Sequence, residues 1–432
     1  MIWNPKYECM SRAEVEELQL AKLKKQVAYT YERVPHFKKK LDAIGLKPSH
    51  IKSFKDYQNV PFTTKDDMRD NYPYDLFAVP MKEIIRIHAS SGTTGNATVV
   101  GYTRNDMDMW TECVARMVCM AGAGPDDIAQ ISFGYSLFTG AFGLHYGLEK
   151  VGAAVIPISG GNTERQIKIM QEFGSTLLVS TPSYALYMAE VAEKLGVDMK
   201  KLPLRCGLFG GEGHTHEMRR EIENRLQVHV TENYGLSEIL GPGVSGECLY
   251  HTGMHISEDY FYFEVVDPDT GELLPEGEMG EIIITPLQKE GIPLLRYRTK
   301  DLSKLMYDPC ECGRTSARME KIQGRTDDML IIRGVNVFPS QIESVVLNIQ
   351  GIGPNYEIIV DTAHHLDYIE VLVELSDASM LESFKELERT EKLVREKLKV
   401  MLGIDAKVRL VEPASLKRFE GKAKRVTDKR KK

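Results

Sequence analysis

The sequence has 432 residues, of which 42% are hydrophobic and 27% charged, and its formal net charge is −7. This length exceeds one ordinary hydrophobic core, so we expect about two or three packed units, and the composition is that of a globular protein. The mildly negative charge argues against a general nucleic-acid-binding surface.

No targeting or membrane segment is visible. The first residues contain no basic region leading into an apolar run, and no stretch of about 18 uninterrupted apolar residues occurs. The seven cysteines are an odd number in a long chain without an export signal, which does not suggest a disulfide framework. We therefore expect a cytoplasmic protein with no membrane contact.

The first half of the chain alternates between helical and strand patterns. Ser11 and Glu14 form a capping box at the start of a helix that runs to about Val34. Apolar runs at 84–88 and 98–102 flank a Ser/Thr/Gly segment, and a helix is expected from Asn105 to about Ala121. The alternation that continues to residue 231 predicts a largely parallel α/β sheet with ligands at the carboxyl ends of its strands.

From about residue 246 the pattern changes. Short strands separated by Asp-Pro and Pro-Glu-Gly turns indicate a β-rich subdomain, and strands and a long helix follow after residue 324. We therefore predict an α/β fold in two domains. The large N-terminal domain comprises residues 1–324, with its β-rich part at about 246–324, and the small α+β C-terminal domain comprises residues 325–432.

The Ser/Thr/Gly segment has the composition of a phosphate-binding turn. Its glycines allow close approach of the backbone, and its hydroxyls and successive N–H groups can surround phosphate oxygens. It is not a Walker A loop, because residue 96 is Asn and no Gly-Lys-Ser/Thr follows. By itself such a cluster is more often an ordinary surface loop. The segment comprises Ser90, Ser91, Gly92, Thr93, Thr94 and Gly95.

Four segments further along the chain favour the phosphate-binding interpretation. In order, they are 233–238 (Asn-Tyr-Gly-Leu-Ser-Glu), 297–301 (Tyr-Arg-Thr-Lys-Asp), 324–328 (Gly-Arg-Thr-Asp-Asp) and Gly421-Lys422. With the Ser/Thr/Gly segment they resemble the adenylate-forming superfamily of acyl-CoA synthetases and luciferases. Residues 2–5, 76–80, 101–106 and 331–339 look specifically like the phenylacetate-CoA ligase family. The resemblance extends from residue 2 to about residue 428.

The resemblance implies a large adenylate-forming domain with a small mobile C-terminal domain, and a reaction in two steps. ATP would activate an arylacetic acid such as phenylacetate to its acyl-adenylate, and CoA would then accept the acyl group. Bringing a carboxylate to the α-phosphate requires the protein to neutralise charge and align two anions. Two alternatives are an adenylyltransferase acting on a deazaflavin or another acceptor without CoA, and a non-catalytic nucleotide-binding scaffold.

The resemblance also implies roles for single residues. Lys422 would be the main catalytic cation, binding both the carboxylate and the α-phosphate. Glu238, with Thr94 nearby, would hold Mg²⁺, which prefers oxygen ligands. By composition alone Lys422 is one of nine basic residues in 417–432 and would be a solvated charge. Nucleotide contacts are expected from Ser90, Ser91, Gly92, Thr93, Thr94, Gly95, Gly211, Glu212, Gly213, Asn233, Tyr234, Gly235, Ser237, Asp301 and Arg325.

Within that set, Asp301 is expected to accept hydrogen bonds from the ribose hydroxyls, and Arg325 to approach the same ribose and the phosphates. Tyr234 is expected to stack on the adenine, with 211–213 running beneath it. One departure from the superfamily pattern is Asn96, which stands where many members have Lys. In those members the lysine usually serves the outgoing phosphates, so Asn96 is expected to weaken the contacts with pyrophosphate.

Two further sets belong to the acid and to CoA. Tyr135, Phe138 and Phe142 are expected to line the acid pocket, although aromatic residues here could equally be core. For the CoA step, the C-terminal domain would rotate about the hinge residue Asp327. That rotation would withdraw Lys422 and present the binding residues Arg333 and Gly334 to the pantetheine arm. Family members also suggest a possible homodimer, but no stretch identifies an interface.

A metal site is expected in the β-rich part. Cys310 and Cys312 form a tight C-x-C turn, and Cys248 with a nearby histidine would complete a tetrahedral set of the kind that holds structural Zn²⁺. We favour His255 over His251 because His255 begins a predicted strand. Free thiols are the alternative, since a bare C-x-C is weak evidence.

Overall fold

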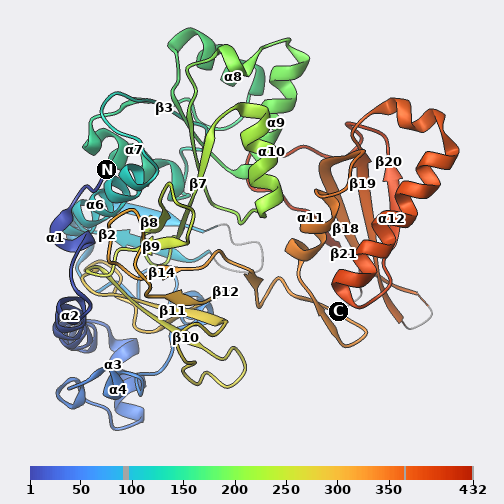
Figure 1. Ribbon diagram of the computed structural model, residues 1–432. Helices are drawn as coiled ribbons and strands as arrows, with labels where there is room; N and C mark the ends of the chain where they lie inside the picture. Colours follow the sequence, from blue (N-terminus) through green and yellow to red (C-terminus); the bar gives the residue numbers. More distant parts are fainter. Residues whose placement is uncertain (91–96, 364–365, 431–432) are drawn as a thin grey trace.

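The computed structural model describes residues 1–90, 97–363 and 366–430. The chain forms a large N-terminal part and a small C-terminal domain, and the small domain lies beside the helices α9 (Pro182–Lys194) and α10 (His216–Leu226) of the large part (Figure 1). This arrangement confirms the predicted fold class. Among the described residues, no helix is both long and apolar enough to cross a membrane.

Helices at the N-terminus wrap the outside of the large domain. The Ser11 side chain accepts a hydrogen bond from the Glu14 N–H, and the Glu14 side chain accepts from the Ser11 N–H, which confirms the predicted capping box. Val15, Leu23 and Val27 of the following helix are buried against the core. The helices are α1 (Pro5–Glu8), α2 (Arg12–Arg33), α3 (Pro35–Ala43), α4 (Phe54–Tyr57) and α5 (Lys65–Asp70).

A nine-stranded sheet forms the centre of the large domain, in the order β13-β14-β9-β8-β7-β6-β5-β3-β4. Its parallel half consists of β3 (Ile128–Ile131), β4 (Ala154–Ile156), β5 (Leu177–Ser180), β6 (Cys206–Phe209) and β7 (His229–Leu236). Its antiparallel half adds β8 (Gly241–Glu247), β9 (Met254–Ile256), β13 (Leu305–Met306) and β14 (Arg318–Met319).

The antiparallel half corrects the prediction of a largely parallel sheet. Strand β7 continues to Leu236 and turns directly into β8, and a connection this short can join only antiparallel neighbours. Gly235 makes this turn possible, because a Cβ there would lie 1.8 Å from the carbonyl oxygen of Gly241. The residues after 246 therefore extend the central sheet as well as forming a separate β-rich layer.

Five helices cover the central sheet: α6 (Arg104–Met120), α7 (Gly140–Val151), α8 (Thr163–Phe173), α9 (Pro182–Lys194) and α10 (His216–Leu226). Helices α6 and α7 belong to the main core, whereas α8, α9 and α10 share a second apolar cluster. A Cβ at Gly143 would lie 2.5 Å from the Trp110 ring, so this glycine allows α7 to approach α6 closely.

A second, antiparallel sheet lies beside the first, in the order β10-β11-β12-β15. Its strands are β10 (Phe261–Val266), β11 (Gly280–Pro286), β12 (Tyr297–Ser303) and β15 (Gly324–Arg325), and a separate hairpin pairs β1 (Arg86–Ala89) with β2 (Val99–Tyr102). In the register of β12 and β15, Asp301 lies opposite Arg325. Two residues 24 positions apart in the sequence are thereby brought together.

The C-terminal domain has its own core and a four-stranded sheet in the order β20-β19-β18-β21. Its elements are β16 (Leu330–Ile332), β17 (Val335–Val337), α11 (Pro339–Val346), β18 (Ile352–Ala363), β19 (Leu366–Leu375), α12 (Phe384–Leu402), β20 (Lys407–Val411) and β21 (Val426–Asp428). The last strand, β21, pairs in parallel with β18. This pairing attaches residues 426–428 of the basic segment 417–432 to the sheet of the C-terminal domain.

Candidate active site

Three predicted nucleotide-binding residues converge where β7, β12 and β15 meet. Tyr234 Oη donates to Asp301 Oδ2 at 2.7 Å, and Arg325 Nη1 donates to Asp301 Oδ1 at 2.5 Å. Burial raises the pKa of Asp301, and the Arg325 charge and the Tyr234 hydrogen bond oppose that shift. Each carboxylate oxygen keeps a free lone pair, so Asp301 can still accept hydrogen bonds from vicinal hydroxyl groups.

Glu238 lies in the turn after β7 and is buried. Thr98 Oγ1 donates to Glu238 Oε1 at 3.2 Å, and Ser90 Oγ lies 2.6 Å from the same Thr98 hydroxyl. Ser90, at the start of the predicted phosphate loop, is therefore linked to Glu238 through Thr98. Ser91, Gly92, Thr93, Thr94, Gly95 and Asn96 lie outside the described residues.

Two lysines that the sequence analysis did not single out surround Glu238. Lys65 Nζ lies 3.6 Å from Glu238 Oε1, and its side chain is 43% exposed. Lys289 is buried and donates to the carbonyl oxygens of Glu238 at 3.3 Å and Ile239 at 2.7 Å. Burial lowers the pKa of Lys289 to about 8, although Asp106 and Glu238 oppose that shift. Lys289 thus holds the backbone of the Glu238 turn, while Lys65 faces its carboxylate.

The predicted adenine segment lies beside the segment that carries Lys422. Glu212 accepts one hydrogen bond from the Ser183 N–H of α9 and another from the Ala423 N–H, both at 2.8 Å. Burial raises the pKa of Glu212. Lys422 itself is exposed, and it adjoins the residue whose N–H is bound by Glu212. The structure therefore brings Lys422 close to 211–213.

Neighbouring residues keep this region in place. Asn233 Nδ2 donates to the carbonyl oxygen of Phe209 at 2.8 Å, which joins the carboxyl ends of β6 and β7. Ser237 Oγ lies 3.0 Å from Thr139 Oγ1 at the start of α7. Both contacts are buried, so Asn233 and Ser237 shape the backbone around the candidate nucleotide site.

The predicted acid-binding aromatic residues belong to two separate ring contacts: Tyr135 packs on Phe142, and Phe138 packs on Phe133. The Tyr135 and Phe142 rings meet edge to face at 5.2 Å, and Tyr135 Oη lies 3.0 Å from His145 Nδ1. Phe138 is 43% exposed and faces Phe133 at 6.5 Å. His145 was not predicted from the sequence.

His88 and Arg86 of β1 also contact the Phe142 ring, with centroid distances of 5.7 Å and 4.7 Å. Arg86 Nη2 donates to Tyr146 Oη at 2.8 Å. Neither β1 residue carried a sequence signal for this environment, because the hairpin and α7 meet only in the tertiary structure.

The predicted hinge residue adjoins the candidate nucleotide site, whereas the predicted CoA residues lie within the C-terminal domain. Asp327 pairs with Arg325, whose Nε donates to Asp327 Oδ1 at 2.9 Å. Arg333 and Gly334 have φ values of 51° and 80° and form the turn between β16 and β17. Arg333 Nε donates to the Asp367 carbonyl oxygen at 2.7 Å within the C-terminal domain.

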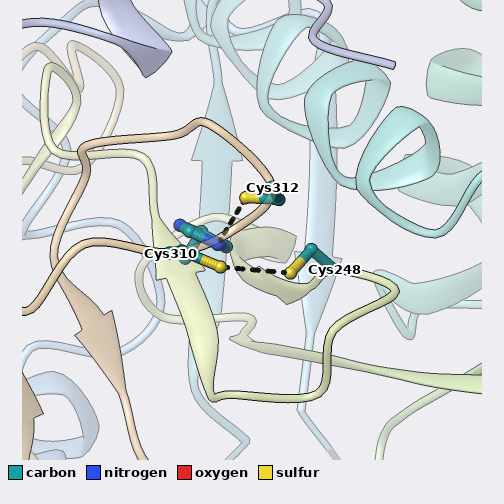
Figure 2. A group of neighbouring side chains, drawn as sticks. Cys248, Cys310 and Cys312 are labelled. Carbon is teal, nitrogen blue, oxygen red and sulfur yellow. Dashed lines mark hydrogen bonds between the residues drawn. The ribbon is translucent and has the colours of Figure 1, made fainter.

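The four predicted zinc ligands form one cluster. Figure 2 shows Cys248, Cys310 and Cys312 converging, and the ligand atoms of these three and His255 lie within 4.8 Å of one another. Cys248 Sγ and Cys310 Sγ are 3.7 Å apart, close to the roughly 3.8 Å that two thiolates span around tetrahedral zinc with bonds of about 2.3 Å. His251 lies outside this group.

The donor chemistry of the cluster fits a zinc ion. His255 Nδ1 lies 3.1 Å from Ser316 Oγ, and His255 Nε2 lies 3.3 Å from Cys312 Sγ. Burial lowers the pKa of His255 to about 3, so the ring is neutral, and burial raises the pKa of Cys248 to about 12 in the absence of a cation. A divalent ion would stabilise the thiolate forms.

Residues 17–286 match the family described as AMP-binding enzyme, and residues 334–430 match the AMP-binding enzyme C-terminal domain. A phenylacetate-coenzyme A ligase of Thermus thermophilus is 46% identical over 445 aligned positions that cover 100% of both chains. Another from Escherichia coli is 46% identical, covering 99% of this chain and 98% of the relative. The chain belongs to the phenylacetate-coenzyme A ligase family.

Solved structures of another ligase indicate which arrangement of domains this phenylacetate-coenzyme A ligase family member adopts. 2-Hydroxyisobutyryl-CoA ligase in the postadenylation state with 2-HIB-AMP matches with a TM-score of 0.94 at 29% identity, covering 99% of this chain and 92% of that one. The same ligase in the thioesterification state with CoA matches with a TM-score of 0.73 over the same shares at 30% identity. The present arrangement resembles the postadenylation state.

Ion pairs across the domain boundary support that arrangement in this ligase family member. Glu190 of α9 accepts from Arg418 Nε at 2.8 Å and from Asn355 Nδ2 at 2.7 Å, and both donors belong to the C-terminal domain. Arg418 also binds Glu374 within its own domain at 2.7 Å. Sequence reasoning missed Glu190, because an acidic residue on an amphipathic helix gives no sign of a distant partner.

Proposed function

We propose that the protein is a phenylacetate-CoA ligase that forms phenylacetyl-CoA, AMP and pyrophosphate from phenylacetate, ATP and CoA. The observation that carries the proposal is the identity of 46% with phenylacetate-coenzyme A ligases over the whole chain. An acceptor other than CoA is not favoured by these relatives.

In the first step, a phenylacetate oxygen attacks the α-phosphorus of ATP and pyrophosphate leaves. Lys422 would neutralise the carboxylate and the α-phosphate as they meet, and Asp301 would hold the ribose through its hydroxyl groups. The contacts of Asp301 with Tyr234 and Arg325 support this role, because they fix the carboxylate before the nucleotide binds.

Glu238 fits a magnesium ligand by its chemistry. It is a buried carboxylate whose contacts with Thr98 and Lys65 leave acceptor capacity, and oxygen ligands suit this hard cation. Bound Mg²⁺ would neutralise phosphate charge. Lys65 Nζ and Thr98 Oγ1 approach the same carboxylate oxygen of Glu238. We assign Lys65 to the outgoing pyrophosphate, because Asn96 carries no charge that could bind it.

In the second step, the CoA thiol loses its proton and its sulfur attacks the acyl carbonyl, and AMP leaves. For this step we propose that the C-terminal domain rotates about Asp327, so that Lys422 leaves and the turn formed by Arg333 and Gly334 reaches the pantetheine arm. The two scores against the two states of 2-hydroxyisobutyryl-CoA ligase support such a rotation.

We further propose that Cys248, His255, Cys310 and Cys312 hold a structural Zn²⁺. The ion would link the segment that carries Cys248 and His255 to the turn that carries Cys310 and Cys312. A cytoplasmic location and a homodimer are also proposed from the family resemblance. Light scattering during size-exclusion chromatography tests the dimer.

Pyrophosphate release with ATP, Mg²⁺ and phenylacetate, measured with and without CoA while the acyl product is followed by mass, tests the reaction. The expected result is CoA-dependent phenylacetyl-CoA. Pyrophosphate release without any thioester would contradict the CoA step, and no pyrophosphate release with a panel of aryl acids would contradict the whole assignment.

A further inference from the structure

A second group of side chains that could hold a metal is separate from the candidate nucleotide residues and shares none of the four ligands of the cysteine cluster. Glu223 comes from the last turn of α10, His229 begins β7, and His251 lies in the turn after β8. Their ligand atoms all lie within 4.8 Å of one another, and each of the three side chains is partly exposed. Nothing in the proposed ligase reaction uses these residues.

We propose that Glu223, His229 and His251 bind a divalent transition-metal ion of the zinc class. The two Nε2 atoms are 3.1 Å apart, and the ring centroids are 4.7 Å apart. Two nitrogens at about 2.0–2.1 Å from a tetrahedral zinc ion would be separated by about 3.3 Å, so only a small adjustment is needed. Partial exposure leaves a fourth position for water.

The choice of metal follows from the ligands. Imidazole nitrogens favour zinc, copper, nickel or cobalt over magnesium and calcium, and one carboxylate completes a mixed nitrogen and oxygen set. The cysteine cluster offers mainly thiolates, so the two sites would hold the same ion in chemically different surroundings. That difference allows the two sites to be told apart in one sample.

Residues behind His251 can orient it as a ligand. His251 Nδ1 lies 3.2 Å from Glu247 Oε2, and Arg219 Nη2 holds both oxygens of Glu247 at 2.8 Å and 2.6 Å. An Nδ1–H bond to this carboxylate would leave the Nε2 lone pair free for a metal. Arg219 Nη1 also lies 2.7 Å from Nδ1, a contact that requires Nδ1 as acceptor. Metal binding would therefore exchange the Arg219 contact for the Glu247 hydrogen bond.

The backbone favours a built turn rather than a loose loop. His251 adopts a left-handed φ of 54°, a region that residues other than Gly enter mainly in turns, and its N–H donates to the Cys248 carbonyl oxygen at 3.1 Å. Glu223 Oε1 also accepts from the Val230 N–H at 3.1 Å. The turn that supplies a cysteine to the thiolate cluster thus supplies a histidine to the second site.

A hydrogen-bonded histidine pair is the competing explanation of the 3.1 Å contact. In that case one Nε2–H donates to the other nitrogen, and Glu223 serves only the Val230 N–H. The two explanations differ in one measurable property. Only a metal site would take up an ion, and that uptake would require all three side chains.

The test uses the full-length protein, saturated with Zn²⁺ and then depleted of weakly held metal by dialysis against a mild chelator. Co²⁺ is titrated in, and the absorption spectrum is recorded together with the metal content. We expect one equivalent of Co²⁺ with weak d–d bands and no thiolate-to-cobalt charge transfer. His229→Gln and Glu223→Gln should each weaken uptake at least tenfold, whereas the exposed His50→Gln should leave it unchanged.

Glu223→Gln retains an acceptor for the Val230 N–H, so it keeps the fold if His229→Gln does not, and circular dichroism checks both variants. The proposal is overturned if the chelator-treated protein takes up no Co²⁺, or if both variants take up Co²⁺ as well as the unsubstituted protein does. It is also overturned if the bound cobalt shows only thiolate charge transfer that Cys310→Ser removes. Metal uptake is independent of phenylacetyl-CoA synthesis, so a failure of the ligase assay leaves this result intact.

Discussion

Glu190→Gln should separate the two half-reactions, because the side-chain partners of Glu190 among the described residues lie across the domain boundary. Its carboxylate accepts from Arg418 at 2.8 Å and from Asn355 at 2.7 Å, with the Glu190 and Arg418 side chains 11% and 16% exposed. Glutamine keeps one acceptor but turns an N–H₂ group towards one donor. With hydrogen bonds to charged groups each contributing about 1.5–3 kcal/mol, a net loss of about 2 kcal/mol is reasonable.

A loss of about 2 kcal/mol corresponds to a shift of about 30-fold away from the docked arrangement. We expect phenylacetate-dependent exchange of pyrophosphate into ATP to slow by about tenfold or more. Consumption of synthetic phenylacetyl-adenylate by CoA should be unchanged or faster, since that step is proposed to use the rotated domain.

The matched control is Glu193→Gln on the same helix, α9. Glu193 is 56% exposed and pairs with Arg225 within the large domain, so this exchange should change neither half-reaction by more than about twofold. The reasoning is refuted if Glu190→Gln slows both half-reactions equally, or if it slows neither of them.

Four further variants, three with one substitution and one with two, test individual sites. Lys422→Ala should lower adenylation by about 100-fold or more, because it removes the charge that joins the two anions, while ATP binding measured by calorimetry changes little. Asp301→Asn should raise the KM for ATP by about tenfold or more through the lost charged acceptor. Lys65→Met should raise the KM for Mg-ATP by about two- to tenfold, since its charge is partly screened. Cys310→Ser combined with Cys312→Ser should remove one zinc per chain and lower the thermal midpoint by several degrees.

Contrary results are defined for each of the four. Adenylation at the normal rate by Lys422→Ala would contradict the catalytic role of Lys422. An unchanged KM for ATP in Asp301→Asn would contradict the ribose-binding role of Asp301, and an unchanged KM for Mg-ATP in Lys65→Met would contradict the phosphate-binding role of Lys65. Lys65→Met also has a control in Lys55→Met, a substitution on the neighbouring helix α4. Unaltered zinc content after the double serine exchange would contradict the structural metal site.

Local signals predicted much of the fold because their causes are local. Ser11 and Glu14 of the capping box are only three positions apart, and the helix that the box predicts begins at Arg12 and ends at Arg33. The alternation of strands and helices likewise identified the parallel half of the central sheet. Its antiparallel half was missed, because a turn at 237–240 that reverses the chain differs little in composition from one that ends a domain.

The candidate site was predicted where residue type and motif coincide, as at Asp301 and Arg325. Contacts between distant segments could not be predicted in the same way. Arg418 and Glu190 are 228 residues apart, and neither side chain has a local feature that selects the other. Lys65 was not singled out from the sequence, because its contact with Glu238 joins two segments that lie far apart along the chain.

The pairing of β21 with β18 has a consequence for how the proposed catalytic lysine finds its target. Arg418 fixes one end of the segment that carries Lys422, and β21, beginning at Val426, fixes the other. A cation on a short loop held at both ends explores a small volume, so its effective concentration near the nucleotide is far higher than on a free tail. Removing the last strand would therefore lower the effective concentration of this lysine while leaving the contacts of Asp301 with Tyr234 and Arg325 in place.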